Sequence, residues 1–173
     1  GDRELMEVLR IATTFWLDAP TEVRVRIFGV VHWALFSGLY EHDFERFGAS
    51  YGALDALYAV HALLGRPSFR GHAGRAAGLA TYYSMPVPQW AIMVNGSCAL
   101  AELRNELVHE ARYAGAPTGF AHPTANPGIA MELGAFVSRL TLAVIDVPCG
   151  YTASSVTSRQ LHGLDLTGPL AAV

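Results

Sequence analysis

The 173-residue sequence contains no lysine, and its twelve basic residues are all arginine. Charged residues make up only 16% of the chain and hydrophobic residues 51%, a composition that excludes intrinsic disorder. With a formal net charge of -3, the chain lacks the strongly basic character of a non-specific nucleic-acid binder. The absence of lysine has two interpretations: a GC-rich genome alone would produce it, and arginines can make bidentate contacts with phosphates.

Cysteine is also scarce, since only Cys98 and Cys149 are present and they form no C-x-x-C pattern. A disulfide framework or a zinc knuckle is therefore unsupported, and a reducing, cytoplasmic location is the simpler expectation. Cys98 is expected to be a small buried packing residue. No secretory signal is visible, and charged residues interrupt the longest apolar run, near residues 127–148, so we expect no membrane contact.

Apolar residues recur at helical spacing through most of the chain. The pattern predicts helices over residues 3–17, 20–39, 42–64 and 71–83, one from Trp90 or Ser97 to Tyr113, and one over 127–147. The second of these should face inward with Val25, Phe28, Val31, Leu35 and Leu39. The last should face inward with Ile129, Leu133, Phe136, Leu140 and Val144. With no β-α alternation, the prediction is an all-α helical bundle of about five to seven helices.

The length fits a single domain. We expect a core over about residues 40–148, an N-terminal helical extension over 1–39 and an irregular tail over 149–173 that carries at most one short strand. Because the chain starts with Gly1 and not with methionine, we also expect it to be part of a longer protein with a further N-terminal domain.

The common catalytic motifs are absent: there is no Walker loop, no G-x-G-x-x-G, no H-E-x-x-H and no G-x-S-x-G. The seven histidines show no metal-ligand spacing, so neither a metal site nor a cofactor is predicted. His32 and His61 lie within apolar stretches, and each is expected to be a core or interface histidine with satisfied hydrogen bonds.

One helical segment carries an unusual set of polar residues, Arg104-Asn105 followed after three residues by His109. Leu100, Leu103 and Leu107 would face the core from the same helix. An arginine, usually followed by a polar residue such as asparagine, with a histidine after four to six intervening residues is the signature of the HEPN superfamily of helical ribonuclease domains, which the segment therefore resembles. The aromatic-rich long helix, the Arg-Asn helix and the closing helix, over roughly residues 40–148, resemble its ApeA-like branch.

The resemblance implies a metal-independent endoribonuclease that uses Arg104, Asn105 and His109. In such enzymes the RNA 2′-hydroxyl attacks the adjacent phosphate and leaves a 2′,3′-cyclic phosphate. A histidine, with an ordinary pKa of about 6.5, suits the proton transfer. A guanidinium would stabilise the phosphoryl oxygens through paired donors, and Asn105 would orient the phosphate or the imidazole. The resemblance further implies a role as a defence or toxin effector.

Helix geometry complicates this site, because residues five apart on a regular helix point roughly 140° from each other. Three solutions stay open: Arg104 curls round the helix, the helix is irregular at Arg104, or a homodimer builds one composite site from two copies. The resemblance favours the homodimer. Glu102, Glu106 and Glu110 would lower the positive charge of such a site, and they could instead pair with Arg104 or tune His109. On helix physics alone, the segment is a solvated surface with weak ion pairs.

A second basic cluster follows the long helix, with Phe69 among its residues. Its members, together with Arg112, are candidate RNA-binding residues that could hold phosphates and stack a base: Arg66, Arg70, His72 and Arg75. The alternative is a charged, solvated loop. Trp90 and the Tyr82-Tyr83 pair favour core anchoring over base stacking. Beside the ribonuclease, the sequence leaves open a non-catalytic HEPN-like module for dimerisation or for binding RNA or nucleotides.

Overall fold

The structure, a computed structural model, describes residues 2–119, 127–147 and 149–157. Within these residues the chain forms seven α-helices, one short 3₁₀ helix and one two-stranded hairpin, which confirms the predicted all-α bundle. The elements are α1 (Asp2–Asp18), α2 (Thr21–Ser37), α3 (Asp43–Leu63), α4 (Gly71–Tyr82), the 3₁₀ helix η1 (Gln89–Ala91), α5 (Ala99–Glu110), β1 (Arg112–Tyr113), β2 (Ala116–Pro117), α6 (Pro127–Val144) and α7 (Gly150–Ala153).

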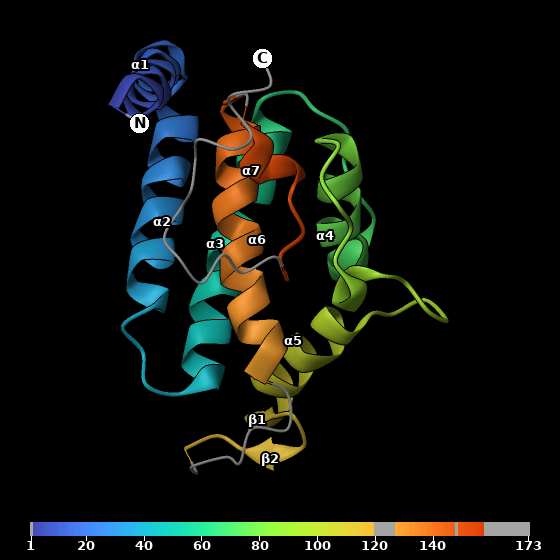
Figure 1. The fold of residues 1–173 in the computed structure, drawn as a ribbon. Helices are drawn as coiled ribbons and strands as arrows, with labels where there is room; N and C mark the ends of the chain where they lie inside the picture. Colours follow the sequence, from blue (N-terminus) through green and yellow to red (C-terminus); the bar gives the residue numbers. More distant parts are fainter. Residues whose placement is uncertain (1, 120–126, 148, 158–173) are drawn as a thin grey trace.

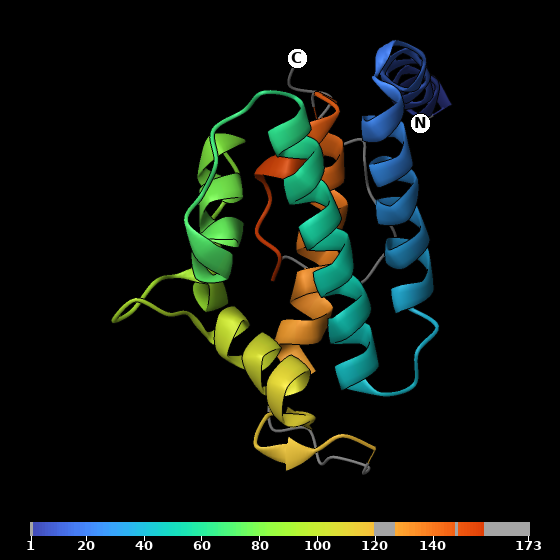
Figure 2. The same ribbon diagram turned by 180° about the vertical axis from the view of Figure 1, so that it is seen from behind.

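Helix α3 is the centre of the bundle. Figures 1 and 2 show α2 on one side of α3 and α6, and α4 with the start of α5 on the other, while α1 lies at the far end of α2. The core joins α3, α6 and the inner faces of the helices beside them, and Phe47, Leu54 and Phe136 are among its fully buried side chains.

Helix α6 packs on α3 with the face that the sequence predicted. Ile129, Leu133, Phe136, Leu140 and Val144 are all buried. The two helices approach closely at Gly134, where a Cβ atom would lie 3.6 Å from Oγ of Ser50. The periodicity therefore identified both the helix and its inner face.

The polar side of α6 contains a buried arginine, Arg139, whose residue is only 3% exposed. Its guanidinium donates to Oγ of Ser154, to the hydroxyl of Tyr151 and to the carbonyl oxygens of Ala135 and Ser155, at 3.0–3.2 Å. It also lies 4.1 Å from the centre of the Tyr151 ring. Arg139 thus anchors α7 to α6. The short helix α7 lies where an irregular tail was expected.

The predicted inner face of α2 is wrong. Val25, Phe28, Val31, Leu35 and Leu39 are all exposed, between 42% and 76%. The face that packs on the bundle carries Val23, Ile27 and Val30. Both faces of α2 are apolar, so the spacing of hydrophobic residues could not distinguish the inner face from the outer one.

Several boundaries also differ from the predictions. Trp90 lies in the 3₁₀ helix, where its residue is 5% exposed, and α5 begins only at Ala99. Residues 112–117 form a hairpin where a helix end and an irregular loop were expected. The part of the predicted irregular tail from residue 158 onward lies outside the described residues.

Candidate functional site

Helix α5 presents the Arg-Asn-His motif to one side while its other side is fixed in the core. Leu100 and Leu103 are buried. Leu107 packs against α3, where a Cβ atom at Gly48 would lie 3.7 Å from Cδ2 of Leu107. At the start of α5, Cys98 is buried as predicted, and its thiol lies 3.5 Å from the carbonyl oxygen of Ala73 in α4. These contacts fix the orientation of the helix.

The structure brings the three motif residues together within one chain. Nη1 of Arg104 donates to Oδ1 of Asn105 and to Nε2 of His109, each at 3.1 Å. Because a guanidinium can only donate, Nε2 of His109 accepts, and the proton of the neutral ring lies on Nδ1. Helix α5 is continuous through both residues, so the long side chain of Arg104, which is half-buried, spans the angular gap. Asn105 and His109 are exposed.

Two of the three acidic residues on α5 have partners other than the motif. Oε2 of Glu106 accepts the backbone N–H of Gly115 at 3.0 Å, which ties α5 to the hairpin of β1 and β2. Glu110 lies 3.7 Å from Arg112, and Arg112 also donates to the carbonyl oxygen of Gly115. These carboxylates therefore hold the hairpin beside His109, a role that the sequence analysis did not predict.

The end of α5 makes this hairpin possible. Ala111 caps the helix with a left-handed conformation, φ 50°, and its N–H donates to the carbonyl oxygen of Glu106. The hairpin turn, Ala114-Gly115, also has two positive φ angles, 50° and 83°, as tight two-residue hairpin turns require. In the sequence, only the Ala114-Gly115 dipeptide indicates this turn, and alanine rarely adopts the positive φ angle that the turn requires.

A second polar cluster lies between α3 and α4. The hydroxyl of Tyr51 donates to Nδ1 of His72 at 2.9 Å, and Nη1 of Arg75 lies 3.2 Å from the same nitrogen. Arg75 also donates to Oδ1 of Asp55 at 2.6 Å, and its guanidinium lies 4.6 Å from the centre of the Tyr58 ring. His72 and Arg75 thus belong to helix α4, not to a loop, and both contact protein groups.

The positive charge of Arg104 affects the pKa values of two residues in this second cluster. Burial lowers the pKa of His72, and the positive charges of Arg75 and then Arg104 lower it further against the effect of Asp55. Burial and Asp55 raise the pKa of Tyr51 to about 12, although Arg75 and Arg104 act in the opposite direction. The tyrosine therefore stays protonated as a donor, and His72 is biased toward its neutral form.

Arg66 lies apart from these groups, in a network at the end of α3. It donates to the hydroxyl of Tyr83, to the carbonyl oxygen of Val144 at 3.1 Å and to Asp146 at 3.4 Å. Tyr83 in turn contacts Nδ1 of the fully buried His61 at 3.0 Å. Arg66 therefore contacts protein groups other than those that His72 and Arg75 contact. Arg70 is exposed.

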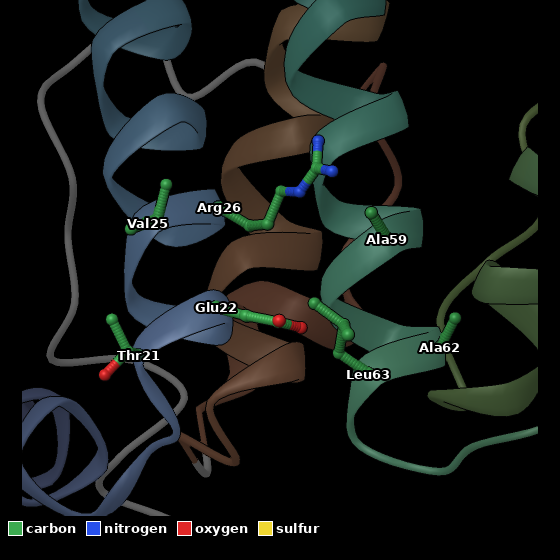
Figure 3. A pocket seen from close by; sticks show the side chains of 7 residues that line it. All are labelled: Thr21, Glu22, Val25, Arg26, Ala59, Ala62 and Leu63. Atoms are coloured by element: carbon green, nitrogen blue, oxygen red, sulfur yellow. The ribbon is translucent and has the colours of Figure 1, made fainter.

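Residues outside the motif line two surface grooves of the described part of the molecule. One, about 710 Å³, lies between α2 and α3, with Glu22 and Arg26 extending toward α3 (Figure 3). Another, about 680 Å³, lies beside the start of α5 and includes Glu102 and Glu132, and Glu132 accepts the indole N–H of Trp90 at 2.9 Å.

Comparison of the chain with known protein families, curated proteins and solved structures finds no match. Among the described residues, no group of three or more His, Cys, Asp or Glu side chains could hold a metal ion. None of the described helices has the length and apolarity that a membrane span requires.

Proposed function

We propose that this chain is a metal-independent endoribonuclease whose site is Arg104, Asn105 and His109. The observation that carries the proposal is the double contact of Arg104 with Asn105 and His109, at 3.1 Å each. It gathers a fixed cation, a polar amide and an imidazole on one exposed surface of a rigid helix. The proposal also draws on the resemblance of the motif to the HEPN signature.

The reaction can be written for these groups. When the substrate phosphate draws Nη1 of Arg104 away from His109, the lone pair of Nε2 becomes free and accepts the proton of a ribose 2′-hydroxyl, whose oxygen bonds to the adjacent phosphorus as the bond to the 5′-oxygen breaks. The imidazolium then returns the proton to the leaving 5′-oxygen, which gives a 2′,3′-cyclic phosphate and a 5′-hydroxyl. Both contacts of Arg104 use Nη1, so Nε and Nη2 are available to the phosphoryl oxygens.

Cleavage of single-stranded and structured RNA in EDTA tests the proposal. Arg104→Ala should lose the charge that stabilises the phosphate, and His109→Gln should keep a polar side chain without proton transfer. We expect each to lower cleavage about 10²- to 10⁴-fold. Arg10→Ala, which removes the same charge from an exposed ion pair on α1, should cleave like the wild type. Cyclic-phosphate ends should be found on the products.

No cleavage by the folded wild type, or equal cleavage by all variants, would contradict the proposal. Mixing the Arg104→Ala and His109→Gln variants then distinguishes a catalytic site within one chain from a composite site shared by two chains. If each chain carries its own site, the mixture stays inactive. If a homodimer forms one composite site, as the resemblance implies, mixed dimers recover part of the activity. The contact within one chain favours the first form.

The second candidate is a non-catalytic HEPN-like module for dimerisation or for binding RNA or nucleotides. The exposure of Asn105 and His109 favours it, because a catalytic site gains from the exclusion of water. RNA binding without cleavage, weakened by Arg104→Ala, would support this candidate.

A further inference from the structure

Helix α2 has an outer face that the bundle leaves uncovered. Its large apolar residues, with Leu39 just beyond the helix, are 42–76% exposed: Val25, Phe28, Val31, Leu35, Phe36 and Leu39. On a helix of 3.6 residues per turn most of these positions lie on the side away from Val23, Ile27 and Val30, which face the core. Val31, four residues after Ile27, lies at the boundary between the two sides. Figure 3 shows Arg26 and Glu22 extending toward α3, and Val25 lies with them along the groove between the two helices. We call the set of exposed apolar residues the outer face of α2.

The area of this face is at the upper end of what a monomer usually exposes. At roughly 100 Å² per half-exposed side chain, its six residues amount to about 600 Å², against about 300–600 Å² for the largest apolar patch on a monomer. The six residues alone therefore supply about three quarters of the roughly 800 Å² per partner of a standard protein interface. A helix that is apolar on all sides is normally buried on all sides.

The spacing of the outer face is that of a helix that pairs with another helix. Val25, Phe28, His32, Leu35 and Leu39 follow one another at intervals of three, four, three and four residues, the pattern of a coiled-coil seam. His32 is exposed at the middle of this seam, with its ring 4.6 Å from that of Phe36. An apolar seam of this kind favours a helical partner over an extended or disordered one.

The charges at the two ends of the seam identify the partner. Arg24 flanks the seam near the start of α2, and Glu41 lies just beyond its end. In the described part of the chain, the guanidinium of Arg24 hydrogen-bonds only to the hydroxyl of Thr21, at 3.2 Å, and Glu41 has no ion pair there. Two α2 helices in antiparallel orientation would place Arg24 of each copy beside Glu41 of the other. Parallel helices would place like charges together.

We infer that α2 pairs in antiparallel orientation with α2 of a second copy of this chain. In this two-fold arrangement Val25 of one copy lies opposite Leu39 of the other, and each contact occurs twice. The interface leaves α5 free, since α2 and α5 lie on different sides of α3 (Figures 1 and 2). The inference is therefore independent of the proposed ribonuclease, and it differs from a composite site built by two α5 helices.

Sedimentation equilibrium of the chain tests the inference. The wild type should be a dimer at micromolar concentration. Phe28→Glu and Leu35→Glu should each weaken the dimer about 100-fold, because they bury a charge at the centre of the seam. Both positions are exposed, 66% and 69%, so both variants should fold, as checked by circular dichroism. Val94→Glu, at a 65% exposed site in the loop before α5, is the matched control and should stay dimeric.

Charge reversal tests the orientation. Arg24→Glu and Glu41→Arg should each weaken the dimer about five- to tenfold, and the double variant should restore it. Rescue within one chain is not expected, because the two residues lie at opposite ends of a helix about 25 Å long. A wild type that is monomeric at roughly 100 µM would overturn the inference, whatever other molecule binds α2. A dimer that persists in Phe28→Glu, or a double variant without rescue, would also overturn it.

Discussion

Replacement of His61 by leucine would test how the buried polar network supports the fold. His61 is fully buried in α3, where Nε2 donates to the carbonyl oxygen of Pro67 at 2.7 Å. Nδ1 therefore accepts from the hydroxyl of Tyr83 at 3.0 Å. Leucine fits the surrounding rings of Phe69 and Tyr82 but forms neither hydrogen bond. At about 1 kcal/mol for each lost bond, the free energy of unfolding should fall by about 2 kcal/mol.

The pH dependence of this loss has a defined sign. Burial lowers the pKa of His61 below 6.5, so the folded state binds fewer protons at this site than the unfolded state. The stabilisation by His61 is thus fully present above pH 6.5 and is lost as the pH falls through its folded pKa. The difference in unfolding free energy between the wild type and His61→Leu should therefore become smaller at acidic pH.

Urea denaturation followed by circular dichroism at pH 8 and at pH 5 measures both effects. The variant should also melt about 4–8 °C below the wild type at pH 8. His109→Gln, at an exposed histidine of α5 away from the inferred dimer interface, is the control and should change the unfolding free energy by less than about 0.5 kcal/mol. Equal stability of wild type and His61→Leu at pH 8, or a gap that does not change with pH, would refute the reasoning.

Two glycines of α4 and the cap of α5 give further predictions. Gly78→Ala should lower the unfolding free energy by about 1–3 kcal/mol, because its Cβ would overlap the ring of Phe69. Gly74→Ala, whose Cβ would meet nothing within 4 Å, should raise the unfolding free energy by about 0.5–1 kcal/mol. Thermal melts of both variants check this, and an equal effect would contradict the packing at Phe69. Ala111→Gly should stabilise the chain by about 0.5–1 kcal/mol in the same assay, since glycine adopts its left-handed φ of 50° without strain. A lower melting temperature would refute it.

The sequence predicted the class of fold and most helices because each inner face repeats at helical spacing. The outcome for α6 and for α2 shows where this reasoning stops. In α6 a single apolar face is available, and its five predicted residues are buried. In α2 two apolar faces compete, and only the packing of α3 against Val23 and Ile27 decides between them. Periodicity carries no information about such a choice.

The candidate site was predictable in its residue types but not in its geometry. The motif drew attention to Arg104 and His109, yet their contact depends on one side-chain conformation that spans the helix surface. The bond from Gly115 to Glu106 joins a turn to a helix nine residues earlier, and no sequence rule gives it. Arginine is a common phosphate ligand, but the guanidinium of Arg66 donates to the hydroxyl of Tyr83 and to the carbonyl oxygen of Val144.

The central place of α3 between α2 and α6 has a consequence for synthesis on the ribosome. Phe47 and Leu54 of α3 emerge with α2, but α6, which brings Phe136 to the same core, follows about 90 residues later. At roughly 5–20 residues per second, the apolar faces of the α2–α3 pair wait about 5–20 s for the helix that covers them. Over that interval chaperones can bind the exposed apolar faces of the nascent chain. The rate at which the residues between α3 and α6 are translated therefore affects the yield of folded protein.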